Sequence, residues 1–374
     1  MEQASFAAKT LSSSSSSMLG LSKELITRRC RHPASDQLLQ YSPGIGFLQA
    51  YPAIRATATF DYNNAASSID LASPSAFPSF LPPEVRELRD PAARSFASRI
   101  RRLPVQTSLS KSPIMTSCVK PTFFSKDLPP VVLLHGFDSS CLEWKNTYPR
   151  LEKANIECWA FDILGWGFSH SETLSSVGVA AKREHLYEFW RSYIKRPMVL
   201  VGPSLGGAAA IDFTNAYPEA VFKLVLVNAQ GYAKGTGNKA RLPKFFAYAG
   251  VSLLKNVLLR TYASSLIHHN LPWTALIDQM HVGRLHCLMP GWSQTSVEFM
   301  LSGGYDVGSK VSKIDKETLV IWGEEDRIIS KDVPERLKND LQNVKLVFIS
   351  SCGHLPHVDK ADTVATLISE FCKT

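Results

Sequence analysis

The sequence lacks the cysteine patterns that mark disulfide frameworks and zinc sites. Its seven cysteines lie far apart, no CxxC pair occurs, and no Cys/His cluster has zinc-finger spacing. A scattered, odd-numbered set is typical of reduced thiols that are mostly buried. Cys352 lies two residues before His354. Simple packing is the favoured interpretation of Cys352, and a redox-sensitive thiol is the alternative.

Long apolar runs are also missing. The longest, residues 245–254, stops at Lys255 and is too short to cross a bilayer, so no transmembrane helix is predicted. Nucleic-acid-binding motifs and basic–aromatic repeats are absent. The net charge of +8 is concentrated at the start, where residues 1–128 hold 15 Lys and Arg against 9 Asp and Glu. We therefore expect no nucleic-acid partner.

Acidic residues are scarce in the first 60 positions. Only Glu2, Glu24 and Asp36 occur there, whereas serine fills positions 12–17 without a break. Serine-rich, arginine-bearing starts with few acids are similar to plastid or mitochondrial transit peptides, and the serine run favours a plastid. We expect residues 1–60 to be a leader that directs the protein to the chloroplast. An ordinary disordered tail is the alternative.

The composition changes at residue 82, where two prolines and nearby acids predict the start of a helix. Leu88, Ala92, Phe96 and Ile100 recur every four residues and give this helix one apolar stripe. The stripe packs on the core or, with the neighbouring arginines, touches an anionic membrane face; we favour packing. Residues 61–128 are thus expected to form an N-terminal extension with this amphipathic helix and the first strands.

From residue 129 onward, short apolar runs alternate with helical patterns. The runs, typical of strands buried on both faces, are 131–135, 158–162, 198–204, 224–228, 319–322 and 344–349. The helical patterns are 182–194, 206–217, 333–341 and 361–372. This alternation predicts an α/β fold with a mostly parallel sheet flanked by helices. Because ligands bind such sheets at the carboxyl ends of strands, catalytic residues should directly follow these runs.

A serine follows the third run. Ser204 is the centre of a G-x-S-x-G motif between an apolar strand and a helix. A serine on a sharp strand-to-helix turn needs glycines two positions away on both sides, because a side chain there would clash. The start of the following helix also favours negative charge. Ser204 is therefore the predicted nucleophile of an ester-cleaving enzyme.

This nucleophile needs a general base and a group that orients the base. His354 follows the last apolar strand, whereas His357 is a weaker candidate that would pack or cap locally. Asp326 follows the run 319–322 and fits the chain order of serine, acid and histidine. Glu324 and Glu325 are its alternatives. We predict that His354 is the base and that Asp326 orients it.

An oxyanion formed during the reaction needs two backbone N–H donors. Leu205 directly follows the nucleophile, and Phe137 follows the run 131–135 and a glycine that lets the chain turn. We predict that their N–H groups form the oxyanion hole. His135 is expected to be structural, as is the turn at 162–169 beside the pocket.

Four motifs stand in order over residues 129–374: H-G-F, D-x-x-G-x-G-x-S, G-x-S-x-G and G-H-x-P-H. With these motifs the chain resembles the α/β-hydrolase family. The resemblance implies an α/β-hydrolase fold with its core at 129–230 and 311–374, a helical cap insertion at 231–310, and no metal or organic cofactor. A serine nucleophile departs from the epoxide hydrolase and dehalogenase branches, where aspartate stands at that position.

The expected cap is rich in apolar and aromatic residues, which include Phe245, Phe246, Leu258, Tyr262, Trp273 and Trp292. Part of this surplus would form the cap's own core, and a large lipophilic substrate would use the rest. Together with the leader, it makes the chain similar to plastid hydrolases related to chlorophyll dephytylases and pheophytinases. That similarity implies a lipophilic ester substrate such as a phytyl or prenyl ester, with phytol release feeding chlorophyll or tocopherol metabolism, and peripheral contact with a plastid membrane.

Two other functions remain open. The same triad could hydrolyse a C–C bond or another acyl compound, and some plant hormone receptors use this fold as a catalytically inert binder. The sequence does not define an oligomeric state.

Overall fold

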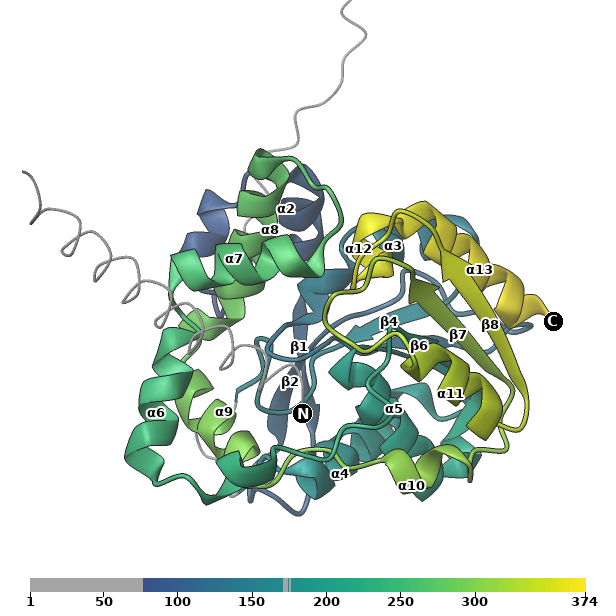
Figure 1. Cartoon of the computed structure of the whole chain (residues 1–374), viewed down its shortest axis with the longest axis horizontal. Helices are drawn as coiled ribbons and strands as arrows, with labels where there is room; N and C mark the ends of the chain where they lie inside the picture. The colour runs from purple at the N-terminus through teal and green to yellow at the C-terminus, as the bar shows by residue number, and fades with distance from the viewer. Residues whose placement is uncertain (1–76, 171–173, 175) are drawn as a thin grey trace, which may run out of the picture. The chain divides into compact units, whose positions relative to one another are not determined.

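The computed structural model describes residues 77–170, 174 and 176–374. These residues fold around an eight-stranded sheet in the order β1-β2-β4-β3-β5-β6-β7-β8 (Figure 1). Strands β3 to β8 are parallel, and β2 pairs antiparallel with both β1 and β4. The strands are β1 (Arg101–Val105), β2 (Ile114–Val119), β3 (Val131–Leu133), β4 (Cys158–Phe161), β5 (Met198–Pro203), β6 (Val221–Val227), β7 (Thr318–Gly323) and β8 (Val344–Ile349).

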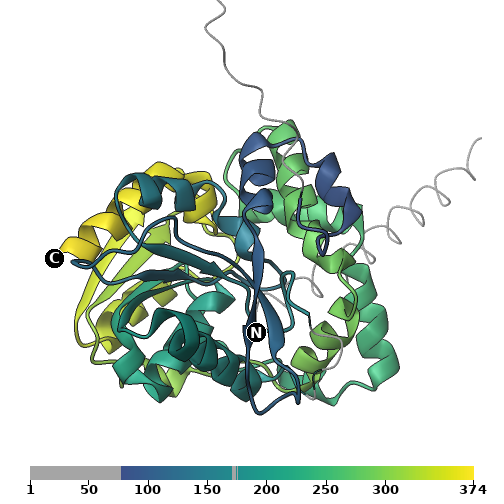
Figure 2. The same cartoon turned by 180° about the vertical axis from the view of Figure 1, so that it is seen from behind.

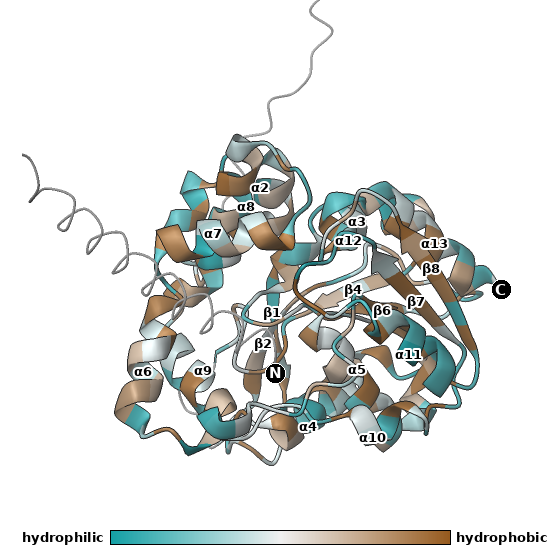
Figure 3. Cartoon of the chain, viewed as in Figure 1, coloured by the Kyte–Doolittle hydropathy of each residue, from teal (hydrophilic) through white to brown (hydrophobic). Residues whose placement is uncertain are grey.

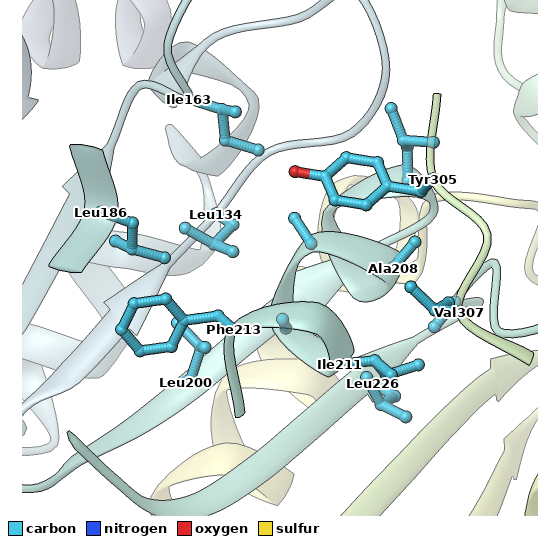
Figure 4. Packing of buried hydrophobic residues seen from close by; sticks show 14 of the residues in the cluster. Leu134, Ile163, Leu186, Leu200, Ala208, Ile211, Phe213, Leu226, Tyr305 and Val307 are labelled. Carbon is cyan, nitrogen blue, oxygen red and sulfur yellow. The ribbon is translucent and has the colours of Figure 1, made fainter. Parts of the chain in front are cut away.

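Helices cover both faces of the sheet, because successive side chains of a strand point to opposite faces. On one face, Leu200 and Leu226 belong to a buried cluster with residues of α4 (Val179–Phe189), α5 (Leu205–Ala216) and α11 (Val333–Asp340), as Figure 4 shows for the first two helices. On the other face, Val199 and Val225 cluster with residues of α2 (Pro91–Ser98), α3 (Thr147–Lys153) and α13 (Ala361–Lys373). The predicted fold class is confirmed.

The predicted strands are all present, with small shifts at their ends. The largest shift is in β6, which begins at Val221 and not at residue 224. This earlier start brings Lys223 into the strand. In the structure its ammonium group is buried but paired, 2.8 Å from a carboxylate oxygen of Glu317 and 3.2 Å from the carbonyl oxygen of Phe371.

The single helix expected from residue 83 is divided into two. A 3-10 segment, η1 (Pro83–Glu87), ends before Asp90, and α2 begins at Pro91. Proline favours an extended conformation in the residue before it, and Asp90 is extended with ψ of 115°. The Asp90 side chain then caps α2 by accepting a hydrogen bond from the N–H of Ala92.

The apolar stripe of this region packs on the protein core. Leu88, Phe96 and Ile100 are buried in the same cluster as the sheet, and the neighbouring Arg99 forms an ion pair with Glu152. These contacts support the packing interpretation of the stripe over membrane contact.

The segment between β6 and β7 is a helical insertion. It contains η5 (Gly237–Arg241), α6 (Lys244–Leu253), α7 (Val257–Ile267), α8 (Trp273–Leu285), η6 (His286–Leu288), α9 (Trp292–Leu301) and, just before β7, α10 (Gly308–Val311). Its apolar residues divide into two groups. Met280, Trp292 and Phe299 are buried, whereas Phe245, Phe246, Leu258, Tyr262 and Trp273 are exposed. Much of the apolar surplus is therefore exposed and does not belong to the buried core.

The remaining helical segments are η2 (Cys141–Trp144), η3 (Trp190–Ile194), η4 (Pro218–Ala220) and α12 (Pro356–Asp359).

The six cysteines from Cys118 to Cys372 are free and buried, as expected. Among the described residues, no helix is both long and apolar enough to cross a membrane. The predicted leader at 1–60 lies outside the described residues, as does the start of the predicted extension at 61–128.

Candidate active site

Ser204 lies on a strained turn between β5 and α5. Its φ of 50° and ψ of −122° are unfavourable for a residue with a side chain. The neighbouring glycines allow the turn: a Cβ on Gly202 would lie 2.3 Å from the carbonyl oxygen of Gly206, and one on Gly206 would lie 2.4 Å from that of His135. This is the geometry of a nucleophile elbow, and it explains why the motif needs both glycines.

Asp326 and His354 come together at the adjacent strand ends. His354 Nδ1 lies 2.8 Å from Asp326 Oδ2, and both side chains are buried. The alternatives Glu324 and Glu325 are exposed. Because an ionised carboxylate only accepts hydrogen bonds, Nδ1 carries the proton, and Nε2 is left as the basic nitrogen.

Asn228, which sequence reasoning missed, holds Asp326 in place. Its Nδ2 donates to Asp326 Oδ2 over 2.7 Å, while its Oδ1 accepts from the N–H of Gly323 over 2.8 Å. The N–H groups of Ile328 and Ile329 donate to Asp326 Oδ1. Burial would raise the pKa of Asp326, but its interactions with His354, Asn228 and these N–H groups outweigh burial and hold the pKa below its ordinary value. Asp326 is therefore an anion at neutral pH.

The loop expected to hold the oxyanion lies beside Ser204. A Cβ on Gly136 would lie 3.6 Å from Ser204 Cβ, and Phe137 follows it, half-buried. His135 is structural, as expected: its Nε2 accepts from the N–H of Ile163 over 3.0 Å, and Nδ1 lies 2.8 Å from the carbonyl oxygen of Gly136. Leu205 begins α5 immediately after Ser204.

Glu143 holds this loop through the backbone of Gly136. Both of its carboxylate oxygens lie 3.3 Å from the backbone nitrogen of Gly136, and Oε1 lies 2.8 Å from His357 Nε2. Burial opposes ionisation of Glu143, but His357 outweighs burial and lowers the pKa to about 2. His357, the weaker candidate for the base, is thus engaged by Glu143 and packs against Trp144, with ring centroids 4.3 Å apart.

Asp138 ties the same loop to the helical insertion. Its Oδ1 accepts from Trp292 Nε1 over 2.8 Å and lies 3.0 Å from His286 Nε2. Its Oδ2 is paired with the guanidinium group of Arg260, on α7. Burial acts against the charge, but Arg260 and His286 keep the pKa of Asp138 well below its ordinary value. Nothing in the sequence pattern indicated these partners.

The loop that carries His354 is held by the end of α7. The N–H of His354 donates to the carbonyl oxygen of Ile267 over 2.7 Å, and Asp359 accepts from the N–H groups of Gly353 and His269. His268 Nδ1 lies 2.6 Å from Asp359 Oδ1. The insertion therefore contacts two loops. One is the loop at residues 135–138, called the oxyanion loop after its predicted role, and the other is the loop at residues 351–355, called the histidine loop.

Two further hypotheses can be assessed from these surroundings. Burial raises the pKa of Cys352 to about 12, which opposes a reactive thiolate and favours packing. Among the described residues, Asp138, His286 and Cys287 have ligand atoms within 4.8 Å of one another. The Arg260 cation at Asp138, and burial that raises the pKa of Cys287, disfavour a metal ion there.

The turn at residues 162–169 is held by Asp162, which accepts from the N–H groups of Cys141 over 2.6 Å and Phe168 over 2.9 Å. Trp166, in the same turn, packs between Phe137 and Phe299 of α9, at centroid distances of 5.5 and 4.8 Å. These rings form an aromatic row from the oxyanion loop to the insertion.

Comparison with known proteins shows which family this chain resembles. A model of the alpha/beta hydrolase family matches residues 131–367. The alpha/beta hydrolase domain-containing protein VTE7 of Arabidopsis thaliana is 51% identical over 297 residues, which cover 79% of this chain and 90% of VTE7. The 2-hydroxy-6-oxononadienedioate/2-hydroxy-6-oxononatrienedioate hydrolase 1 of Pseudomonas putida is 25% identical over 64% of this chain and 87% of its own length. The structure of a thermophilic esterase from Thermogutta terrifontis shares the fold, with a TM-score of 0.62 and 18% identity over 73% of this chain and 98% of the esterase.

The low pKa of Glu143 leads to a testable pH dependence. A carboxylate whose folded pKa is depressed stabilises the folded state above its unfolded pKa, and this contribution is lost as the pH falls toward the folded value. The ordinary pKa of the group is 4.5, and its pKa in the folded protein is about 2. As the pH falls through this range, the contribution of Glu143 to the free energy of unfolding should decrease by about 1.4 kcal/mol per pH unit. The difference in unfolding free energy between wild type and Glu143→Gln should therefore shrink at acidic pH. Urea unfolding over a pH series measures it.

The exposed Glu325→Gln variant is the matched control, and its difference from wild type should stay small throughout. A Glu143→Gln difference that is the same at neutral and acidic pH would contradict this assignment.

Proposed function

Since the chain belongs to the alpha/beta hydrolase family, we propose that it is a serine hydrolase that cleaves a lipophilic carboxylic ester with a Ser204–His354–Asp326 triad. The observation that carries the proposal is the nucleophile elbow at Ser204 on the same sheet edge as the paired Asp326 and His354. Acyl transfer needs a nucleophile, a base and a group that orients the base, and this arrangement supports assigning those roles to Ser204, His354 and Asp326.

In the proposed reaction, Ser204 Oγ attacks the ester carbonyl carbon while His354 Nε2 takes the hydroxyl proton. The carbonyl oxygen becomes negative and accepts hydrogen bonds from the N–H groups of Phe137 and Leu205. The tetrahedral intermediate collapses, His354 returns the proton to the leaving alcohol, and the acyl group stays on Ser204. A water molecule, activated by the same histidine, then releases the acid and restores Ser204.

Asp326 stays ionised through this cycle, because its hydrogen bonds stabilise the anion. Its role is to fix the ring and the tautomer of His354 and to stabilise the imidazolium that forms. Asn228 acts one step further out as a positioning residue that orients Asp326.

Substitution of the triad should remove catalysis without unfolding the protein. Ser204→Ala should lower kcat by about 10³–10⁶ and abolish labelling by a fluorophosphonate probe. Asp326→Asn should cost about 10²–10⁴, because the imidazole loses its orientation. Hydrolysis of a chromogenic ester measures both, with thermal unfolding as the check on folding.

A Ser204→Ala enzyme that keeps more than about a tenth of the activity would sink the assignment. Labelling of wild type would argue against the inert receptor, since a binder without an active nucleophile does not react. An Asp326→Asn enzyme as fast as wild type would direct attention to Glu324 or Glu325.

For the substrate, we propose a long-chain ester of the phytyl or prenyl type. Support comes from the aromatic row of Phe137, Trp166 and Phe299, which begins directly after Gly136, the residue whose Cβ would lie 3.6 Å from Ser204 Cβ. The alternative is C–C bond hydrolysis on the same triad, which the likeness to the Pseudomonas putida hydrolase favours. Product analysis separates the two, because ester cleavage releases an alcohol and C–C cleavage does not.

If the aromatic row lines the pocket, kcat/KM should rise with the length of the apolar chain. Burial of each methylene stabilises binding by about 0.8 kcal/mol, a factor of about four. Phe299→Ala should flatten this dependence with little effect on acetyl esters, and the ester series should be measured for each variant. Phe371→Ala, a similar deletion of a buried ring in α13, is the control and should keep the slope. A preference of wild type for acetyl esters would overturn the lipophilic substrate and leave Ser204 in place.

We also propose a plastid location, supported by the serine-rich and acid-poor composition of residues 1–60. A fusion of residues 1–80 to a fluorescent protein should enter plastids. The same fusion with Arg28, Arg29 and Arg31 changed to glutamate is the control and should stay outside. Cytosolic fluorescence from the unaltered fusion would contradict the proposal.

A further inference from the structure

The helical insertion carries an unusual concentration of exposed apolar side chains. We define the apolar face as Leu242, Phe245, Phe246, Tyr248, Leu253, Val257, Leu258, Tyr262 and Trp273, all of them exposed. Leu258 and Phe245 are 79% and 77% exposed. The other large exposed hydrophobic residues of the described chain are dispersed over the sequence: Met115, Phe124, Phe222 and Phe348. Concentrated apolar exposure of this kind marks an interaction surface.

Helix α6 shows that this exposure is not an incidental edge of the core. Its inward side is already apolar, because Ala247 and Val251 are buried. Phe245, Phe246 and Leu253 lie on its other sides, where a surface helix normally carries polar residues. Figures 1 and 2 place α6 and α7 at the end of the described unit away from β8 and α13. Figure 3 shows that parts of both helices are hydrophobic.

The stretch of sequence that carries the apolar face has charges of one sign. No Asp or Glu occurs between Glu219 and Asp278, a stretch that contains the entire face. Arg241 and Lys244 are exposed, and Lys244 directly precedes Phe245. Lysine and arginine beside exposed aromatic and aliphatic side chains are the pattern of helices that lie on anionic bilayers.

We propose that the apolar face docks on the surface of a bilayer that contains anionic lipids. Phe245, Leu258 and Trp273 enter the boundary between headgroups and acyl chains, and Arg241 and Lys244 contact lipid phosphates. This docking rests on exposure and charge and does not depend on the proposed ester chemistry.

The structure also connects this surface to the active site. Helix α7 carries Leu258 and Tyr262 on the apolar face, while its Arg260 is paired with Asp138 in the oxyanion loop. The carbonyl oxygen of Ile267, the last residue of α7, accepts a hydrogen bond from the N–H of His354. Docking therefore places the bilayer one helix away from both loops of the site. The consequence that a lipophilic ester enters from the bilayer rests on the proposed function.

The test is co-sedimentation of the full chain with vesicles of phosphatidylcholine, with or without phosphatidylglycerol. Wild type should bind the mixed vesicles, and high salt should release it. The double variant Phe245→Ser/Leu258→Ser should lose about tenfold or more in partition coefficient, because two exposed side chains no longer enter the bilayer. Arg241→Glu/Lys244→Glu should lose the preference for phosphatidylglycerol.

Phe222→Ser/Phe348→Ser is the matched control: it removes two exposed rings from β6 and β8 and should bind as wild type does. All variants carry the same N-terminal residues, so differences between them report on the apolar face. Turnover of a short soluble ester without vesicles should be unchanged in Phe245→Ser/Leu258→Ser. If wild type shows no turnover of this ester, the proposed hydrolase activity is refuted, whereas the docking result is unaffected.

Equal binding of wild type and Phe245→Ser/Leu258→Ser to the mixed vesicles would overturn the proposal. So would sedimentation velocity showing a wild-type dimer that this variant converts to a monomer, since the face would then be covered by a second copy. Binding that is indifferent to phosphatidylglycerol would refute the role of Arg241 and Lys244 and, with it, the anionic bilayer.

Discussion

The turn at Ser204 is the constraint around which the rest of the site is arranged. A serine at φ of 50° is strained, by about 1–3 kcal/mol, and persists only if its surroundings fix it. Here β5 and α5 fix it from both sides, because Gly202, Gly206 and Gly207 let the helix approach the strands to distances that a Cβ would prevent. The apolar cluster between the sheet and α5 stabilises this close approach (Figure 4).

Buried carboxylates fix the loops around that turn. Asp326 orients His354, Glu143 supports Gly136, Asp138 reaches Arg260, and Asp359 binds the backbone of the histidine loop. Each has a cationic or histidine partner, as a buried anion requires. Two of the partners, Arg260 and His268, stand on α7 or directly after it. The insertion therefore helps to position both loops of the proposed site.

The apolar residues of the insertion fall into a buried group and an exposed group. Phe299 and Trp292 are buried, Phe299 against Trp166 and Trp292 as a hydrogen-bond donor to Asp138, whereas Phe245 and Leu258 are exposed. An apolar residue in such a segment can serve the core, a substrate or an external partner. Because the exposed members lie in a stretch without acids, a lipid surface explains them better than a tunnel does.

The sequence by itself determined the α/β architecture and the positions of Ser204, Asp326 and His354 after successive strands, because hydrophobic periodicity and motif spacing are short-range signals. The division of the N-terminal helix at Pro91 was also within reach of a local rule, the restriction on a residue before proline. Only the tertiary structure decided that Asn228 holds Asp326, that Glu143 takes His357, and that Arg260 pairs with Asp138 across 122 residues. It also decided which aromatic residues of the insertion face water. The physical reason is that burial and pairing are properties of contacts between distant segments, and one sequence read along its length does not specify which segments meet.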